Sequence, residues 1–196
     1  MSIKAIKAFD AAWSAARDGG EQGYRVSYAE FKTAVAELKK DGGRISRDEL
    51  QHVAQTIAES PYLTAPAAKE AFSLLKTLGT SKLDSATIDL MKAEFSMRNR
   101  DPFKYLDLPG RLVKNTADLP DAVAKSVTTT HDADSDEDWG EIECRSATLA
   151  GQPVYLVMHR ELGGNLDAQK LEIFARDGRT LATGGIWDGM AGFMWD

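Results

Sequence analysis

The chain has 196 residues, of which 43% are hydrophobic and 28% are charged, a composition typical of a globular protein with a hydrophobic core. No apolar run is long enough to cross a bilayer, and the first residues lack the apolar stretch of a secretory signal, so we expect a soluble cytoplasmic protein without a membrane partner. Export without a cleaved signal stays an alternative. A single cysteine, Cys144, excludes an internal disulfide.

The net charge of −6 is unevenly distributed along the chain. Residues 1–117 contain 18 Lys and Arg against 15 Asp and Glu, whereas residues 118–196 contain 6 against 15. The basic excess of the first part is slight and scattered, and the acidic second part would repel phosphate groups. The sequence therefore predicts no binding to nucleic acid.

Apolar residues recur at helical spacing from residue 2 to about 97, and Gly, Pro and Asp residues divide this stretch into five segments. The stripes are Ile6, Phe9 and Trp13; Phe31, Val35 and Leu38; Leu50, Val53, Ala54 and Ile57; Ala68, Ala71, Phe72, Leu75 and Leu78; and Ile88, Met91 and Phe95. Each stripe is wide enough to face a shared core. Residues 1–97 are therefore predicted to form a helical bundle.

The second part of the chain has a different pattern. Residues 98–117 contain several Pro and Gly residues and are predicted to connect two domains. A short helix is expected at 119–127, followed by strands at 142–149, 154–159, 171–175 and 180–183, with a hairpin turn at Asp177-Gly178. The predicted fold class is α+β: an N-terminal helical bundle plus a small C-terminal antiparallel β-sheet domain, residues 118–196, with one short helix.

Two predicted helix starts carry a serine followed three residues later by a glutamate, Ser27 with Glu30 and Ser46 with Glu49. This is the pattern of a capping box, in which each side chain bonds the backbone N–H of the other residue. Plain helix capping is one interpretation of both segments.

The segment 41–50 also supports a second interpretation. With Gly43 at position 6 of a calcium-binding loop, Glu49 falls at position 12, and a similar segment begins at Gly79. Residues 28–96 therefore resemble a degenerate pair of EF-hands. An EF-hand pair implies binding of a divalent cation, but the first loop as it stands is not expected to hold Ca²⁺. Leu38, Lys40 and Gly42 stand where such a loop needs oxygen ligands.

An acidic segment beginning at His131 matches a calcium loop more closely. Oxygen donors stand at positions 1, 3, 5, 7 and 12 of that loop: Asp132, Asp134, Asp136, Asp138 and Glu143. Position 6 is Glu137, where the turn needs glycine. The two interpretations are a Ca²⁺ site and a solvated acidic loop.

Three segments of the second part occur in a recognisable order. They are the helix start at 119–123, the run Gly-Gln-Pro-Val-Tyr-Leu-Val at 151–157, and the run from Lys170 to Leu181 containing Asp177-Gly178. Residues 118–185 resemble a PepSY-like domain in this order. The resemblance implies a small binding module, often involved in the control of peptidases and usually found outside the cytoplasm.

The C-terminal residues are rich in aromatic and Met side chains. Trp187, Phe193, Met194 and Trp195 are candidate contacts for a protein partner, because Trp and Met are well suited to that role. Packing of the same side chains against the sheet or the helices is the alternative.

Catalytic and cofactor signals are weak. His52, His131 and His159 have no metal-ligand spacing with another His or Cys, and Cys144 is predicted to be a small buried residue in a strand. The glycine patterns of nucleotide-binding and hydrolase sites are missing from the sequence. We therefore expect a non-enzymatic binding or regulatory protein without a cofactor, whose acidic β domain and C-terminal tail contact a protein partner. The alternative is a Ca²⁺ sensor or buffer.

Overall fold

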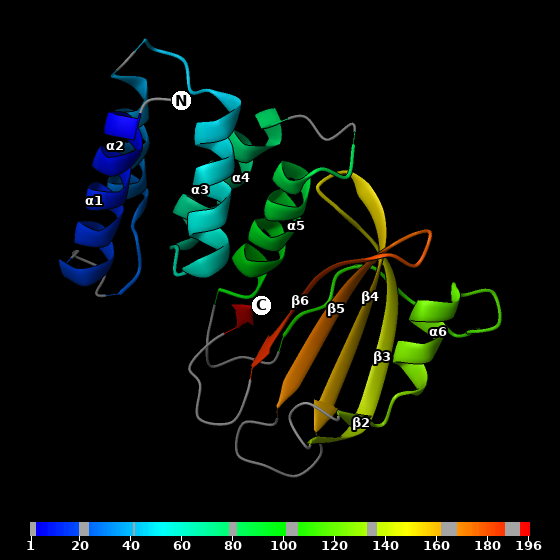
Figure 1. Cartoon of the computed structure of the whole chain (residues 1–196). Coiled ribbons are helices and arrows are strands. Elements are labelled where there is room, and N and C mark those ends of the chain that lie inside the picture. Colours follow the sequence, from blue (N-terminus) through cyan, green and yellow to red (C-terminus); the bar gives the residue numbers. More distant parts are fainter. Residues whose placement is uncertain are drawn as a thin grey trace. The chain divides into compact units, whose positions relative to one another are not determined.

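The computed structural model of the chain describes residues 3–19, 24–40, 42–78, 82–100, 106–132, 137–161, 168–186 and 193–196, without the side chains of Asp132 and Glu137. The chain divides into two compact units, Met1–Arg100 and Asp101–Asp196 (Figure 1). We call them the helical unit and the acidic unit. The acidic unit has 9 Lys and Arg against 17 Asp and Glu.

The described residues of the helical unit form five α-helices and one 3₁₀ turn. They are α1 (Ile3–Gly19), α2 (Tyr28–Lys39), α3 (Arg47–Glu59), α4 (Ala65–Leu75), η1 (Lys76–Leu78) and α5 (Ser85–Arg98). Helix α1 packs on α2, α2 on α4, and α3 on α5. Most of the largest fully buried side chains of the unit come from the predicted stripes and include Phe9, Phe31, Ile57, Leu75 and Phe95, whereas Leu63 comes from the segment before α4.

Both predicted capping boxes are confirmed. At the start of α2, Ser27 Oγ accepts from the Glu30 N–H at 3.3 Å, and Glu30 Oε2 accepts from the Ser27 N–H at 2.7 Å. The arrangement is the same at the start of α3, where Ser46 Oγ accepts from the Glu49 N–H at 3.3 Å and Glu49 Oε2 accepts from the Ser46 N–H at 2.8 Å. Each serine therefore satisfies a backbone donor that the helix itself leaves unpaired.

Two long-range contacts fix the loops of the helical unit. Val26 and Leu63 form a parallel β-bridge between the segments that precede α2 and α4. The Arg47 guanidinium donates to the Leu78 carbonyl and lies 2.9 Å from the Asp84 carboxylate, which caps α5. These contacts join the start of α3 to both ends of the segment between η1 and α5.

The acidic unit is one antiparallel sheet with a short helix. Its elements are β1 (Arg111–Leu112), α6 (Asp121–Thr128), β2 (His131–Asp132), β3 (Glu137–Leu149), β4 (Gln152–Glu161), β5 (Gln169–Ala175), β6 (Thr180–Ile186) and β7 (Met194–Trp195). The strand order is β1-β3-β4-β5-β6-β7, and β2 also pairs with β3. This confirms the predicted α+β class, with helices mostly in the first part and strands in the second.

The structure differs from the sequence-based expectation at the edges of the sheet. The four predicted strands are present but longer, and the two-residue strands β1, β2 and β7 were not predicted, because two residues are too few to show alternation. Strand β1 also lies within the stretch expected to connect the domains. Residues 137–141, which the solvated-loop interpretation leaves irregular, belong to β3 and pair with β4 and β2.

Helix α6 covers one face of the sheet. Val123 packs with Cys144, Val157 and Phe174 in a small core, so the prediction that Cys144 is a small buried strand residue is confirmed. Burial raises the pKa of the Cys144 thiol to about 11. The opposite face of β4 and β5 carries a second apolar set that includes Leu156, Met158, Leu171 and Ile173.

The predicted Asp177-Gly178 turn joins β5 to β6. Gly178 has φ +87°, a conformation that L side chains rarely adopt, and the Ala175 N–H donates across the turn to the Arg179 carbonyl at 2.8 Å. A Cβ added at Gly178 would lie 2.7 Å from the Cβ of Pro120. The turn therefore needs glycine both for its backbone and for its close approach to the start of α6.

Candidate functional site

The predicted calcium ligands of the acidic segment are not assembled in the described residues. Asp134 and Asp136 lie outside these residues, as does the side chain of Asp132. Asp138 Oδ1 lies 3.0 Å from His131 Nδ1, and Glu143 forms ion pairs with Arg145 and with Arg160, the latter at 3.3 Å.

The extended backbone of β3 also keeps the carboxylates of Asp138 and Glu143 apart. Asp138 and Glu143 both lie in the extended strand β3, where each residue adds about 3.3 Å, so their Cα atoms are more than about 10 Å apart. A bound Ca²⁺ holds its oxygen ligands at about 2.3–2.6 Å. Within the described residues, no group of three or more His, Cys, Asp or Glu side chains could hold a metal ion.

The C-terminal aromatic residues form the edge of the sheet. Met194 and Trp195 pair with Gly185 and Gly184 of β6, and Phe193 packs so closely that a Cβ at Gly184 would lie 2.9 Å from its ring. Phe193 is 5% exposed, whereas Met194 is 46% exposed. Trp187 lies outside the described residues.

A cavity of about 370 Å³ lies between α6 and the sheet face that α6 covers. We call it the α6 pocket. Its lining includes Lys125, Ser126 and Thr129 from α6 and its end, His131 and Trp139 from β2 and β3, and His159, Lys170, Glu172 and Thr180 from β4, β5 and β6. A volume of this size suits a small ligand or one or two side chains of a partner.

Three polar side chains meet in the interior of the α6 pocket. Ser126 Oγ lies 2.5 Å from Glu172 Oε2 and 3.1 Å from His159 Nε2, and His159 Nε2 lies 3.2 Å from Glu172 Oε2. Ser126 and His159 are buried, and the Glu172 side chain is 20% exposed. We call this group the Ser-His-Glu cluster.

The available hydrogens determine the roles within the cluster. Ser126 has one O–H, which the 2.5 Å distance directs to the Glu172 carboxylate. Two contacts remain, from His159 Nε2 to Ser126 Oγ and to Glu172 Oε2. Because the carboxylate only accepts and the serine hydrogen is already used, His159 Nε2 is the donor in both. His159 Nδ1 is buried and has no hydrogen-bond partner among the described residues.

The cluster keeps Glu172 ionised. Burial raises the pKa of the Glu172 carboxyl, but hydrogen bonds from His159 and Ser126 and the charges of His159 and Lys170 lower it by more. The pKa of Glu172 therefore lies below its ordinary value.

The cluster contains the residue types of a hydrolytic triad but not its geometry. In a triad, the serine bonds one imidazole nitrogen and the carboxylate orients the ring through the other. Here Ser126 and Glu172 both contact Nε2, and the serine hydrogen is directed to the carboxylate and not to the imidazole. The arrangement orders the three side chains and does not activate Ser126 as a nucleophile.

Trp139 closes one side of the cluster. Its ring centroid lies 5.6 Å from that of His159, and it is 5% exposed. The pairing of β3 with β4 shifts register between Trp139 and Glu141, which makes Gly140 the extra residue of a β-bulge. The bulge sets the direction of the Trp139 side chain, which packs on the imidazole.

Sequence reasoning did not identify the Ser-His-Glu cluster. Ser126 is 33 residues from His159 and 46 from Glu172, so no local motif joins them. One signal was present: His159 continues the alternation of Tyr155 and Val157, and it is a polar residue at the end of an apolar face.

Comparison with models of known protein families, with curated proteins and with solved structures gives no match to this chain. No helix among the described residues is both long and apolar enough to cross a membrane.

Proposed function

We propose that this chain is a non-enzymatic binding protein and that its acidic unit contacts a protein partner through the α6 pocket. The partner inserts an acidic group, either a carboxylate side chain or a C-terminal carboxylate. A regulatory role would follow from such a contact if the partner is an enzyme.

The observation that carries the proposal is the local charge of the pocket. The acidic unit has nearly twice as many acidic as basic residues, yet two of its few lysines, Lys125 and Lys170, line this one cavity. Glu172 inside the pocket is already hydrogen-bonded to Ser126 and His159. A carboxylate entering the pocket would therefore meet two ammonium groups, and Glu172 would repel it less than a bare carboxylate would.

The geometry of the cluster supports binding and not catalysis. An ordered, buried Ser-His-Glu group rigidifies the pocket wall, and a rigid wall lowers the entropy cost of binding. Met194 and Trp195, at the sheet edge, stay candidates for a further contact with the same partner, because Met194 is exposed.

Affinity capture with the full-length chain, in extracts of the cells that produce it, tests the proposal. The test variant is Lys125→Glu/Lys170→Glu. The matched control is Arg111→Glu/Lys114→Glu, which makes the same change in charge at two exposed residues of the same unit. Far-UV circular dichroism shows whether each variant is folded.

We expect the wild type and the control to enrich the same protein and the pocket variant to lose it. Equal enrichment by all three proteins would contradict the proposed site. Enrichment of no protein by the wild type would contradict the proposed function.

A further inference from the structure

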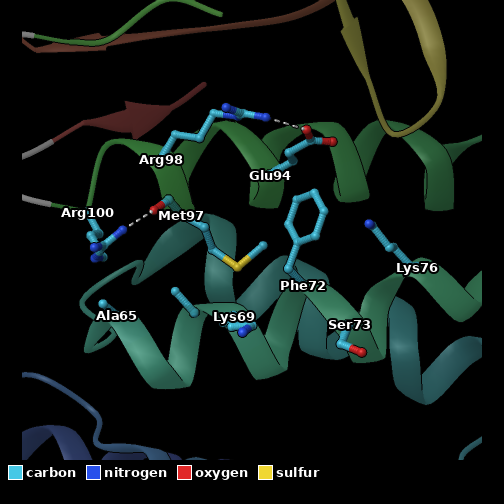
Figure 2. Close-up of a pocket in the computed structure, with 10 residues that line it drawn as sticks. Ala65, Lys69, Phe72, Ser73, Lys76, Glu94, Met97, Arg98 and Arg100 are labelled. Atoms are coloured by element: carbon cyan, nitrogen blue, oxygen red, sulfur yellow. Dashed lines mark hydrogen bonds and ion pairs between the residues drawn. The ribbon is translucent and has the colours of Figure 1, made fainter.

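A second cavity lies within the helical unit, between α4 and α5, and has a volume of about 470 Å³ (Figure 2). We call it the α4–α5 groove. Figure 2 shows the ring of Phe72 rising from α4 and the side chain of Met97 descending from α5 into the space between the two helices. Ala65 and Ala68 of α4 complete the apolar part of the lining.

The sequence of α4 explains why this surface exists. Helix α4 has one apolar stripe, Ala67, Ala71 and Leu75, that is buried in the bundle. Ala65, Ala68 and Phe72 form a second stripe at spacing i, i+3 and i+7, in which Ala65 is exposed, Phe72 is half-buried and Ala68 is buried. The second stripe extends over about two turns, or about 10 Å along the helix axis.

Four cations surround this apolar stripe. Lys69 and Lys76 belong to α4 and the following turn, and Arg98 and Arg100 lie at and beyond the end of α5. Lys69 and Lys76 are exposed, and the Lys76 ammonium lies 4.8 Å from the centroid of the Phe72 ring.

Among the described residues, one carboxylate lines the groove, and it is already paired. Glu94 is buried, and its Oε1 lies 3.2 Å from Arg98 Nη2 (Figure 2). Arg100 Nη1 donates to the Met97 carbonyl at 3.2 Å and stays near the groove. The groove therefore combines an apolar lining with an excess of positive charge, although the helical unit as a whole has only 15 Lys and Arg against 13 Asp and Glu.

We propose that the α4–α5 groove binds an acidic amphipathic helix of a protein partner. The partner helix places apolar side chains at i, i+3 or i+4, and i+7 between Phe72 and Met97, and its carboxylates face Lys69 and Lys76. A helix fits because two parallel ridges with an apolar stripe of about two turns are the usual receptor for an amphipathic helix. The proposal concerns the helical unit and does not depend on the function proposed for the acidic unit.

The test uses the full-length chain and a fluorescein-labelled synthetic peptide of about four helical turns, with Leu at i, i+3, i+4 and i+7, Glu at three positions that flank the Leu stripe, and Ala at the others. Fluorescence anisotropy at low and high salt measures its affinity. The variants are Lys69→Glu/Lys76→Glu and, as the matched control, Lys4→Glu/Lys7→Glu, which makes the same change in charge at two exposed residues of α1. A peptide with Gln in place of Glu is the second control.

We expect the groove variant to bind the Glu peptide about tenfold more weakly than the wild type, and the α1 variant to stay within about twofold. The Gln peptide binds more weakly to the wild type, and added salt reduces the difference between the two peptides. The Met97 methyl signal in the NMR spectrum shifts when the Glu peptide binds.

Four outcomes would overturn the proposal. Equal affinity of the wild type, the groove variant and the α1 variant for the Glu peptide would show that the groove cations do not contribute to binding. An unshifted Met97 methyl signal would show that the peptide binds elsewhere. Saturable binding of decanoate without binding of the peptide would indicate an anionic amphiphile as the ligand. Self-association of the chain that is lost in the groove variant would indicate a second copy as the occupant.

Discussion

Replacement of Ser126 by alanine tests whether the Ser-His-Glu cluster holds α6 on the sheet. The change removes the hydroxyl that donates to Glu172 at 2.5 Å, and leaves the carboxylate with the His159 contact at 3.2 Å. A hydrogen bond to a charged group contributes about 1.5–3 kcal/mol. Because the Glu172 side chain is 20% exposed, water replaces part of the loss, and we expect a cost of about 1.5 kcal/mol at pH 7.

The cost of this substitution depends on pH with a defined sign. The pKa of Glu172 in the folded protein lies below its ordinary value of 4.5, so the stabilisation is fully present above that pH and is lost as the pH falls through the folded pKa. Without the hydroxyl, the folded pKa of Glu172 rises. The difference between the wild type and Ser126→Ala should therefore be constant from pH 7 to about 5 and decrease at lower pH.

Amide hydrogen exchange followed by NMR measures the effect in the acidic unit alone. A cost of about 1.5 kcal/mol corresponds to about tenfold lower protection of the β4 and β5 amides, while the amides of α3 should not change. Thr128→Ala on the same helix is the control, because Thr128 is exposed and its hydroxyl donates to the Ala124 and Lys125 carbonyls of its own helix. Equal loss of protection in both variants, or a cost that does not decrease in acid, would refute the assigned hydrogen bond.

Three further predictions concern local features of the two units. Gly178→Ala should lower the free energy of unfolding of the acidic unit by at least about 1–3 kcal/mol, because the left-handed backbone and the contact with the start of α6 both exclude a Cβ. Gly42→Ala in the helical unit has no described atom within 4 Å of the added Cβ, and it should lower the free energy of unfolding of that unit much less in the same urea titration. Ser27→Ala should lower the free energy of unfolding of the helical unit by about 1 kcal/mol, and Thr64→Ala should leave it nearly unchanged, because the Ser27 side chain caps its helix and the Thr64 side chain makes no cap hydrogen bond. Equal urea midpoints of the two variants would contradict this. Cys144 should react with an aromatic disulfide reagent at pH 8 far more slowly in the folded chain than in denaturant, because burial raises the pKa of its thiol to about 11. Rapid reaction of the folded chain would contradict this and show that the thiol is accessible.

The helices and the central strands could be predicted because their signals are local. Phe9 and Trp13 lie one helical turn apart, and both are buried. The capping boxes and the Asp177-Gly178 turn are likewise defined by residues within a few positions of each other, and all are present.

The candidate site could not be predicted because it depends on register and docking. Glu172 pairs with Val157, and this places it diagonally beside His159 on the same face. A shift of the β4–β5 register by one residue would move Glu172 to the other face. Ser126 reaches the pair only when α6 packs on the sheet through Val123, which is a tertiary contact without a sequence motif.

In the acidic segment, the spacing of the carboxylates did not indicate the strand that contains two of them. The carboxylate spacing of a calcium loop begins at Asp132, but Asp138 and Glu143 are held in an extended strand by its pairing with β4. In this strand Glu143 forms an ion pair with Arg160, at 3.3 Å. The Glu143 carboxylate is thus paired with an arginine of the neighbouring strand, and the spacing of acidic residues along the sequence does not indicate this ion pair.

We propose that the α6 pocket of the acidic unit recognises an acidic group of a partner. An NMR titration of the ¹⁵N-labelled full-length chain tests this with the N-methylamide of N-acetylglutamate, which has one carboxylate, and with the N-methylamide of N-acetylglutamine as a neutral control of nearly the same shape. We expect saturable shifts of the Lys125, His159 and Lys170 amide signals with the carboxylate compound alone, and the loss of these shifts in Lys125→Glu/Lys170→Glu. Equal shifts with both compounds, or saturable shifts confined to residues outside the pocket, would contradict it.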